Sequence, residues 1–311
     1  MGNVARKENE MNSKSMIQNW TTGELNALVK NLGGEKVAKK IQRGEVRVSF
    51  ENITNVLFDK NGQRIPKDLS ADIRNINWGF QLDQPKLKTE IDYAKRIQQL
   101  YEYLGLDAEV TGKQFKTETE RLLALIQKDS QIANIIKGVY LPVILPQLIN
   151  EDLGTVLEQY LKTVQKNYTK TFDGRGFLNN CNGTLVGKVN TVDQSRHNQL
   201  VERMKQGLVI GIHFPNALQG FSINADREQM STLPNGLILS GLDTLIALMM
   251  YPDILACSWN VPGLDLAALS WQATDSFFFE ADDDYLSFNS NNIDSLASAH
   301  DNYSGGLLFL G

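Results

Sequence analysis

The densest group of side chains that could do chemistry lies between residues 213 and 243. It contains an imidazole, two amides, a guanidinium and a carboxylate: His213, Asn216, Gln219, Arg227 and Asp243. Amides and a guanidinium bind polar or anionic ligands through directed hydrogen bonds. These residues follow a predicted strand, and ligand-contacting groups gather where a strand gives way to a helix. We therefore predict a ligand-binding pocket in this region.

The same residues also allow a catalytic and a structural interpretation. A hydrolase or transferase using His213 and Asp243 as acid–base groups is one alternative, and it requires both within hydrogen-bond reach of one substrate atom. In the structural interpretation, His213 satisfies a core hydrogen bond, Asn216 and Gln219 shape a loop, and Asp243 caps a helix. The sequence leaves these interpretations open.

The remaining residues lack the spacing of common metal, nucleotide and nucleophile motifs. The soft metal ligands are all at least 16 residues apart: Cys181, His197, His213, Cys257 and His300. Residues 282–284 are all Asp and are predicted to form a solvated turn, because the following residues do not match a calcium-binding loop. No phosphate-binding loop occurs, and Ser222 lacks the second glycine of a serine elbow. We therefore predict neither a metal nor a cofactor.

A second candidate surface is a basic helix face near the N-terminus. Lys36, Lys39, Lys40 and Arg43 follow one another at helical spacing, so four cations share one face. Such a face can contact phosphates, although it is more typical of an ordinary solvated helix surface. Weak nucleic-acid binding is therefore kept as an alternative function, and nucleic acid is not the expected partner.

Charge is divided unevenly along the chain. Residues 1–200 carry 28 basic and 23 acidic side chains, whereas residues 201–311 carry 3 and 13. A region with so few cations repels phosphate backbones, which argues against nucleic-acid binding by the C-terminal third. We expect a non-enzymatic protein that binds another protein or a small ligand through this acidic C-terminal domain.

Hydrophobic periodicity predicts a mainly helical region over residues 20–172. Residues 1–19 are polar throughout and are predicted to form a disordered leader. Residues 20–50 have the pattern of a helix–turn–helix–strand unit, with its second helix over 35–43. Longer helices are expected from about residue 86 onward, including one that starts at a capping box over 117–120 and one over 152–168.

From residue 173 onward the hydrophobic pattern consists of short apolar runs separated by turn residues. Strands are predicted over 184–189, 208–213, 236–239, 267–271, 276–280, 285–288 and 306–310. Helices are predicted over 192–205, 225–230, 242–250 and 293–301. The fold class expected is α+β, with a helical N-terminal region followed by a mixed-sheet domain over 173–311 that has an antiparallel edge.

Several short segments resemble a group of uncharacterised bacterial hypothetical proteins. They are NALQGFSI at 216–223, REQM at 227–230, LP at 233–234, MYPD at 250–253 and YSGGLLF at 303–309, together with LNALVKNLGG at 25–34 and RGE at 43–45. The resemblance implies a bacterial, cytoplasmic setting. It implies no reaction and transfers no catalytic residue.

Cysteine usage and the N-terminus agree with a cytoplasmic setting. Two cysteines in 311 residues are too few for a disulfide framework, and the first 19 residues have no apolar signal-peptide core. The longest apolar windows fall short of the roughly 20 residues that cross a bilayer as a helix. We predict no membrane association.

Overall fold

The computed structural model describes residues 29, 32, 34–47, 56–82, 91–104, 110–272 and 274–311. The chain has two compact units, Met1–Ile53 and Thr54–Gly311. In the first unit, α3 (Glu35–Gln42) confirms the helix predicted over 35–43. The predicted leader and most of the first helix and strand of the 20–50 unit lie outside the described residues. The predicted division at residue 173 lies inside the second unit.

The second unit combines helices with one mixed sheet. Its α-helices among the described residues are α5 (Tyr93–Leu104), α6 (Gly112–Lys128), α7 (Leu153–Thr171), α8 (His197–Gln206), α9 (Ile223–Gln229), α10 (Leu242–Met250) and α11 (Pro252–Leu255). Short 3₁₀ helices are η1 (Ala133–Lys137), η2 (Asp193–Ser195), η3 (Met230–Thr232) and η4 (Ser295–Ala297).

The strands of the main sheet follow the order β1-β4-β10-β6-β8-β9-β2, and β5 also pairs with β10. They are β1 (Leu141–Leu145), β2 (Gly176–Asn179), β4 (Val209–Gln219), β5 (Leu237–Leu239), β6 (Gly263–Asp265), β8 (Ser276–Ala281), β9 (Tyr285–Asn291) and β10 (Tyr303–Phe309). The β10–β6 and β9–β2 pairs are parallel, and the other pairs are antiparallel. A separate two-stranded sheet joins β3 (Val189–Thr191) to β7 (Leu269–Trp271). The α+β class is confirmed.

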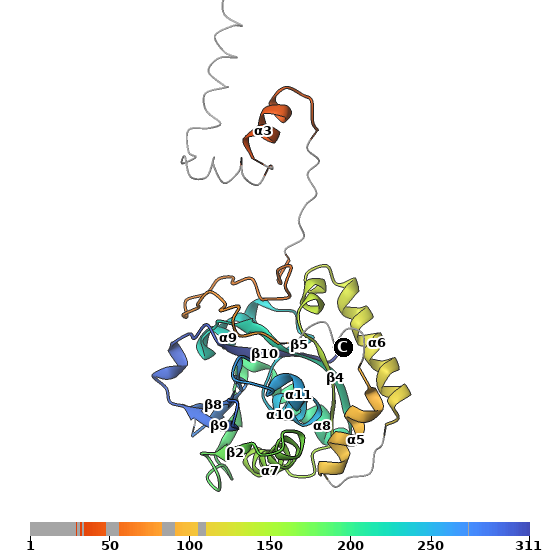
Figure 1. The fold of residues 1–311 in the computed structure, drawn as a ribbon, viewed down its shortest axis with the longest axis vertical. Helices are drawn as coiled ribbons and strands as arrows, with labels where there is room; N and C mark the ends of the chain where they lie inside the picture. The colour runs from red at the N-terminus through yellow and green to blue at the C-terminus, as the bar shows by residue number, and fades with distance from the viewer. Residues whose placement is uncertain are drawn as a thin grey trace, which may run out of the picture. The chain divides into compact units, whose positions relative to one another are not determined.

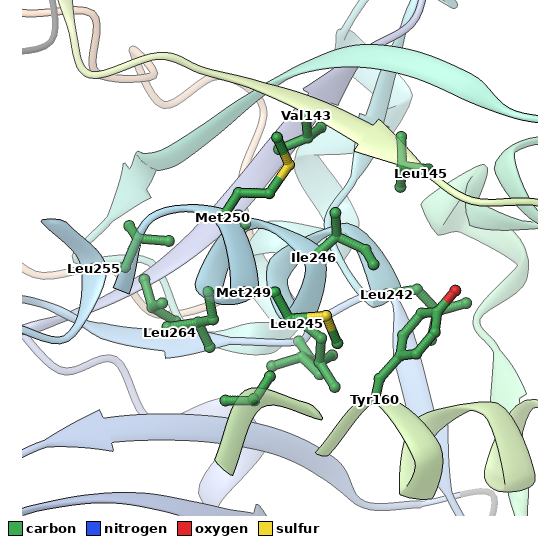
Figure 2. Packing of buried hydrophobic residues seen from close by; sticks show 14 of the residues in the cluster. Val143, Leu145, Tyr160, Leu242, Leu245, Ile246, Met249, Met250, Leu255 and Leu264 are labelled. Atoms are coloured by element: carbon green, nitrogen blue, oxygen red, sulfur yellow. The ribbon is translucent and has the colours of Figure 1, made fainter. Parts of the chain in front are cut away.

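Helix α10 lies at the centre of the second unit (Figure 1); it packs against β1 and β4, and α6 packs against β4. All nine residues of α10 are buried, and seven of them are apolar, which is typical of a helix inside a core. Figure 2 shows how side chains from β1, α7, β6 and α11 surround it: Val143, Leu145, Tyr160, Leu264 and Leu255. The helix therefore fixes the positions of the strands that carry the candidate site.

The strands predicted over 276–280 and 285–288 form an antiparallel hairpin near the C-terminus. Strands β8 and β9 pair antiparallel, and a turn over residues 282–284 joins them. Phe277 and Phe279 point into the core, where both rings pack against Phe288 at centroid distances of 5.3 and 4.9 Å. Phe278 lies on the opposite face, edge-on to Tyr303. Most aromatic side chains of the acidic region therefore build the core.

Several predicted elements or bounds were wrong. Of the strand predicted over 184–189 only Val189 lies in a strand, β3, and the helix predicted over 293–301 is only the 3₁₀ turn η4. Pro142 lies in β1, where proline is tolerated because β1 is at the edge of the sheet. Strand β4 runs to Gln219, beyond its predicted end. Helix α6 begins at Gly112, where Thr111 and Gln114 form the capping box expected at 117–120.

None of the helices in the described ranges is both long and apolar enough to cross a membrane.

Candidate functional site

Strand β4 positions the predicted ligand-binding residues by means of a bulge. In the pairing with β10, Phe214 lies opposite Leu307 and Leu218 lies opposite Gly305, so three residues of β4 face one residue of β10. These three residues are Pro215, Asn216 and Ala217. A bulge changes the direction in which side chains leave the strand, and here the backbone carbonyl of Ala217 accepts a hydrogen bond from the Arg64 N–H at 2.8 Å.

Asn216 and Gln219 line a pocket of about 260 Å³ on the second unit, which we call the amide pocket. The segment over residues 56–82 supplies most of its other side chains. The pocket is lined by Lys60, Asn61, Gln63, Trp78, Phe80, Gln81, Leu82, Lys137, Asn216 and Gln219. Five of these residues have side-chain amides: Asn61, Gln63, Gln81, Asn216 and Gln219. The site is therefore rich in groups that both donate and accept hydrogen bonds.

The floor of the amide pocket contains amide groups that lack hydrogen-bond partners among the described residues. Gln63 is 5% exposed, and its Oε1 is buried without a hydrogen-bond partner. Asn216 is 8% exposed, and among the described residues its side chain makes no hydrogen bond. Gln219 donates from Nε2 to the Phe80 carbonyl at 3.2 Å. Because buried polar groups are normally paired, the unpaired amides of Gln63 and Asn216 make this pocket a candidate site.

The rim of the pocket is cationic and aromatic. Lys60 and Lys137 are exposed, and no Asp or Glu is among the lining residues. The backbone segments next to the two lysines approach closely: a Cβ at Gly62, where φ is +80°, would lie 2.3 Å from the Gly138 nitrogen. Trp78, 52% exposed, adds a flat apolar surface at the same opening.

His213 and Asp243 meet in the core, away from the amide pocket. The His213 Nδ1 lies 2.8 Å from Oδ2 of Asp243, and the two side chains are 1% and 0% exposed. The hydroxyl of Ser240 lies 3.3 Å from the same nitrogen, and Nε2 is buried without a partner. In a nucleophilic triad the carboxylate and the hydroxyl bind opposite ring nitrogens. Here both approach Nδ1, so His213 is not placed to activate Ser240.

The Asp243 carboxylate is held in its charged form by its surroundings. Burial by itself favours the neutral acid, but the hydrogen bond and charge of His213, with the Gly241 N–H at 2.7 Å, hold the pKa of Asp243 below its ordinary value. His197 borders the same carboxylate, and burial lowers the pKa of its imidazole. Its Nε2 accepts from the Leu242 N–H at 3.2 Å, so it is the neutral, Nδ1-protonated tautomer.

Arg227 lies apart from both groups. Its guanidinium donates to the backbone carbonyls of Ala267 at 3.0 Å and Leu269 at 3.3 Å. Burial lowers the pKa of Arg227, against the opposing effect of the neighbouring Asp226 carboxyl. The side chain joins α9 to the start of β7. The five residues predicted as one group thus occupy three places: a pocket, a buried polar pair and a backbone cross-link.

The basic face on α3 is partly neutralised. Lys39 forms an ion pair with Glu35 at 2.5 Å, and Arg43 lies 3.7 Å from Glu45. Lys36 and Lys40 lie on the same helix, without an ion pair in the part of the chain that is described. Nucleic-acid binding by this face stays a prediction.

Within the described ranges, no group of three or more His, Cys, Asp or Glu side chains could hold a metal ion.

Sequence reasoning missed the pocket residues that come from the 56–82 segment. Gln63, Trp78 and Phe80 lie in a stretch with little regular structure, and only tertiary contacts bring them to β4. The one local signal was the turn over residues 59–62, where Oδ1 of Asp59 accepts from the N–H groups of Asn61 and Gln63 at 2.8 and 2.9 Å.

Comparisons of the chain with protein-family models, with curated proteins and with solved structures yield no match.

Proposed function

We propose that this protein is a non-enzymatic binding protein whose amide pocket takes a small anionic ligand rich in hydroxyl groups. The observation that carries the proposal is the convergence of Asn216, Gln219 and Gln63 on one pocket, with unpaired amide groups in its floor. Amides suit hydroxyl-bearing ligands because each can donate and accept hydrogen bonds at once. This proposal develops the small-ligand branch of the expected binding function.

The charge of the rim supports an anionic ligand. Lys60 and Lys137 contribute two positive charges at a pocket that has no carboxylate among its lining residues. Charge-assisted hydrogen bonds from lysine to a carboxylate or phosphate are stronger than neutral ones. The local field therefore favours a ligand with one acidic group, although the chain as a whole has a net charge of −5.

Pocket size and the aromatic surface support a ring-shaped ligand. A volume of about 260 Å³ lies just below the range of about 300 to 1,000 Å³ typical of small-molecule sites. Trp78 and Phe80 offer apolar faces on which the less polar face of a sugar ring can pack. A sugar acid or a sugar phosphate fits all three properties.

The burial of His213 and Asp243 favours this proposal over the hydrolase or transferase alternative. The two side chains lie within hydrogen-bond distance of each other, as a catalytic pair would, but they are 1% and 0% exposed. A substrate atom would have to reach the Nε2 of His213 inside the core. By contrast, Asn216 and Gln219 lie where a ligand has access.

Calorimetric titration of the full-length protein tests the proposal with three matched probes. Glucuronate and glucose 6-phosphate carry the acidic group on the same ring, and glucose is the neutral control. We expect saturable binding of at least one acidic probe, and binding of glucose at least about tenfold weaker, since one charge-assisted hydrogen bond contributes about 1.5 to 3 kcal/mol. Equal affinity for glucose and both acids would contradict the anionic assignment.

Variants locate the binding in the amide pocket. Asn216→Ala removes a floor amide and should weaken the acidic probe about tenfold, while Asn182→Ala, at an exposed position outside the pocket, should leave it unchanged. Lys60→Ala should weaken the acidic probes and leave glucose unaffected. Unchanged binding in Asn216→Ala would exclude the amide pocket as the site.

A further inference from the structure

A second, smaller cavity lies at the beginning of α9 and has the opposite chemical character. We call it the carboxyl pocket; it encloses about 100 Å³ and is lined by Phe221, Ser222, Ile223, Asp265, Asn291, Ser295, Ser298, His300 and Tyr303. Asp265 and Ser222 are buried and form its floor, whereas Ser295, Ser298 and His300 are exposed and form its mouth. The cavity is therefore open to solvent and ends on a carboxyl group.

Asp265 reaches the floor of this pocket without a protein partner. It is the last residue of β6, in parallel register with Gly305 of β10, and it is 5% exposed. No hydrogen bond or ion pair to its carboxyl group is found among the described residues. A carboxylate in such a position is costly unless something pairs with it.

Asp226 of α9 places a second carboxyl group behind the first. It is fully buried, and both of its oxygens lack a hydrogen-bond partner. The backbone of β10 makes room for it, because a Cβ at Gly305 would lie 2.0 Å from Oδ2 of Asp226. Any side chain at position 305 would displace this carboxyl, so the space that Asp226 occupies depends on the glycine.

The groups around the two carboxyls determine which of them ionises. Burial raises the pKa of Asp226 well above its ordinary value, and the Asp265 carboxyl raises it further against the opposing charge of Arg227. Burial raises the pKa of Asp265 to about 7. Tyr303, whose pKa burial also raises, faces Asp265 and Glu280, and His300 stands at the mouth. The ionised form of Asp226 is thus strongly disfavoured, and Asp265 is the carboxyl of the two that lines the pocket.

We propose that the carboxyl pocket binds the ammonium group of a small primary amine, with the Asp265 carboxylate as its counter-ion and the Ser222 hydroxyl beside it. The volume is about three times the ~30 Å³ share of one water molecule in the liquid, enough for an ammonium group on a short chain. The two carboxyls are too few to coordinate a calcium ion, which takes six to eight oxygen ligands. An organic cation needs only one counter-ion and hydrogen-bond acceptors.

The test uses propylammonium chloride as the probe and propan-1-ol as a neutral molecule of the same shape. Amide chemical shifts of the full-length protein are followed by NMR at constant ionic strength, with sodium chloride as a third titration. We expect saturable shifts for propylammonium confined to residues lining the pocket, with a dissociation constant on the order of 1 to 10 mM, because small ligands bind weakly. Equal responses to propanol or sodium would overturn the proposal.

The pH dependence gives an independent readout. The ionised fraction of Asp265 rises about tenfold between pH 6 and pH 8, while an alkylammonium group with a pKa near 10 stays charged. Propylammonium should therefore bind about tenfold more tightly at pH 8. His300→Asn removes the imidazole at the mouth of the pocket, and this variant should keep the pH dependence. Affinity independent of pH in that variant would contradict Asp265 as the counter-ion.

Two substitutions complete the test. Asp265→Asn should abolish saturable binding, and Asp284→Asn, at the exposed turn, should preserve it. Ser298→Lys at the exposed mouth supplies a tethered ammonium group without altering the floor, so it should compete with the probe and weaken it at least about tenfold. Unchanged probe binding in both Asp265→Asn and Ser298→Lys would refute the site, whatever the stability of the first variant.

Discussion

The buried carboxyl groups Asp243 and Asp265 experience opposite electrostatic environments. Asp243 accepts from His213 and from the Gly241 N–H, which hold its pKa below the ordinary value even though burial opposes this. Asp265 has no partner in the described part of the chain, and burial raises its pKa to about 7. The first carboxylate therefore stabilises the fold, and the second destabilises it when ionised.

Removing the Asp243 carboxylate should be strongly destabilising. Asp243→Ala leaves His213 and the Gly241 N–H without their acceptor inside the core, at an expected loss of about 3 to 5 kcal/mol in the free energy of unfolding at pH 7. Because the folded pKa is lowered, this stabilisation is complete above the unfolded pKa near 4 and disappears as pH falls through the folded value. Urea unfolding at pH 7 and pH 3 measures both, with Asp284→Ala as the exposed control. A loss below about 1 kcal/mol at pH 7 would show that the pair contributes little.

Removing the Asp265 carboxylate should have the reverse effect. Its folded pKa of about 7 lies above the unfolded value of about 4, so wild-type stability falls as pH rises between these values. Asp265→Asn should therefore stabilise the protein at pH 8, by up to about 4 kcal/mol for a three-unit shift, and much less at pH 5. Thermal melts at the two pH values measure this difference. Equal effects at both would mean that Asp265 is not the titrating group.

Side-chain types identified part of the candidate site from sequence. Asn216 and Gln219 were predicted as ligand-binding residues, and both line the amide pocket. Arg227 and Asp243, predicted in the same group, do not line this pocket. Residues close in sequence on a strand or helix can point to different faces. Gln63 and Asp265 carried no local signal, since only the folded chain buries them without partners.

At the scale of elements, α10 was predicted with its observed bounds and β4 was cut short. Seven of the nine residues before Tyr251 are apolar, which favours a buried helix, whereas Pro215 is typical of the end of a strand. The bulge opposite Gly306 accommodates that proline, and β10 must already be in place for it to form. Local sequence patterns predict the bounds of a helix more completely than those of a strand whose bulge depends on a partner distant in sequence.

The capping box of α6 should contribute measurably to the stability of the fold. Thr111 accepts from the Gln114 N–H at 3.3 Å, and the Gln114 side chain accepts from the Thr111 N–H at 2.9 Å. Thr111→Ala should lower the free energy of unfolding by about 1 kcal/mol. Thr117→Ala is the matched control, because Thr117 is exposed inside the helix, where alanine is slightly favoured. Denaturant unfolding compares the two; a larger loss from Thr117→Ala would place the helix start where the sequence first suggested it.

At the scale of the whole molecule, the charge division has a structural consequence. Of the 13 acidic residues in 201–311, three are buried: Asp226, Asp243 and Asp265. The acidic surface is correspondingly smaller than the composition indicates, and the cationic rim of the amide pocket comes from Lys60 and Lys137, outside that stretch. Ligand binding as proposed therefore needs residues from both sides of position 173.

The second unit should be stable by itself. Every buried residue in the described core lies at or beyond Leu57, and α3 buries none. A chain of residues 54–311 should therefore melt within about 3 °C of the full-length protein, which corresponds to roughly 1 kcal/mol for a domain of this size. Differential scanning calorimetry measures the midpoint. A drop of about 10 °C would show that residues 1–53 contribute to the core.

A crystal structure of the protein soaked with glucuronate would show whether the amide pocket is a ligand site. We expect electron density for the sugar acid between Asn216 and Trp78, with its carboxylate toward Lys60 or Lys137. Density for glucuronate elsewhere on the molecule, with the amide pocket holding only solvent, would contradict the proposal.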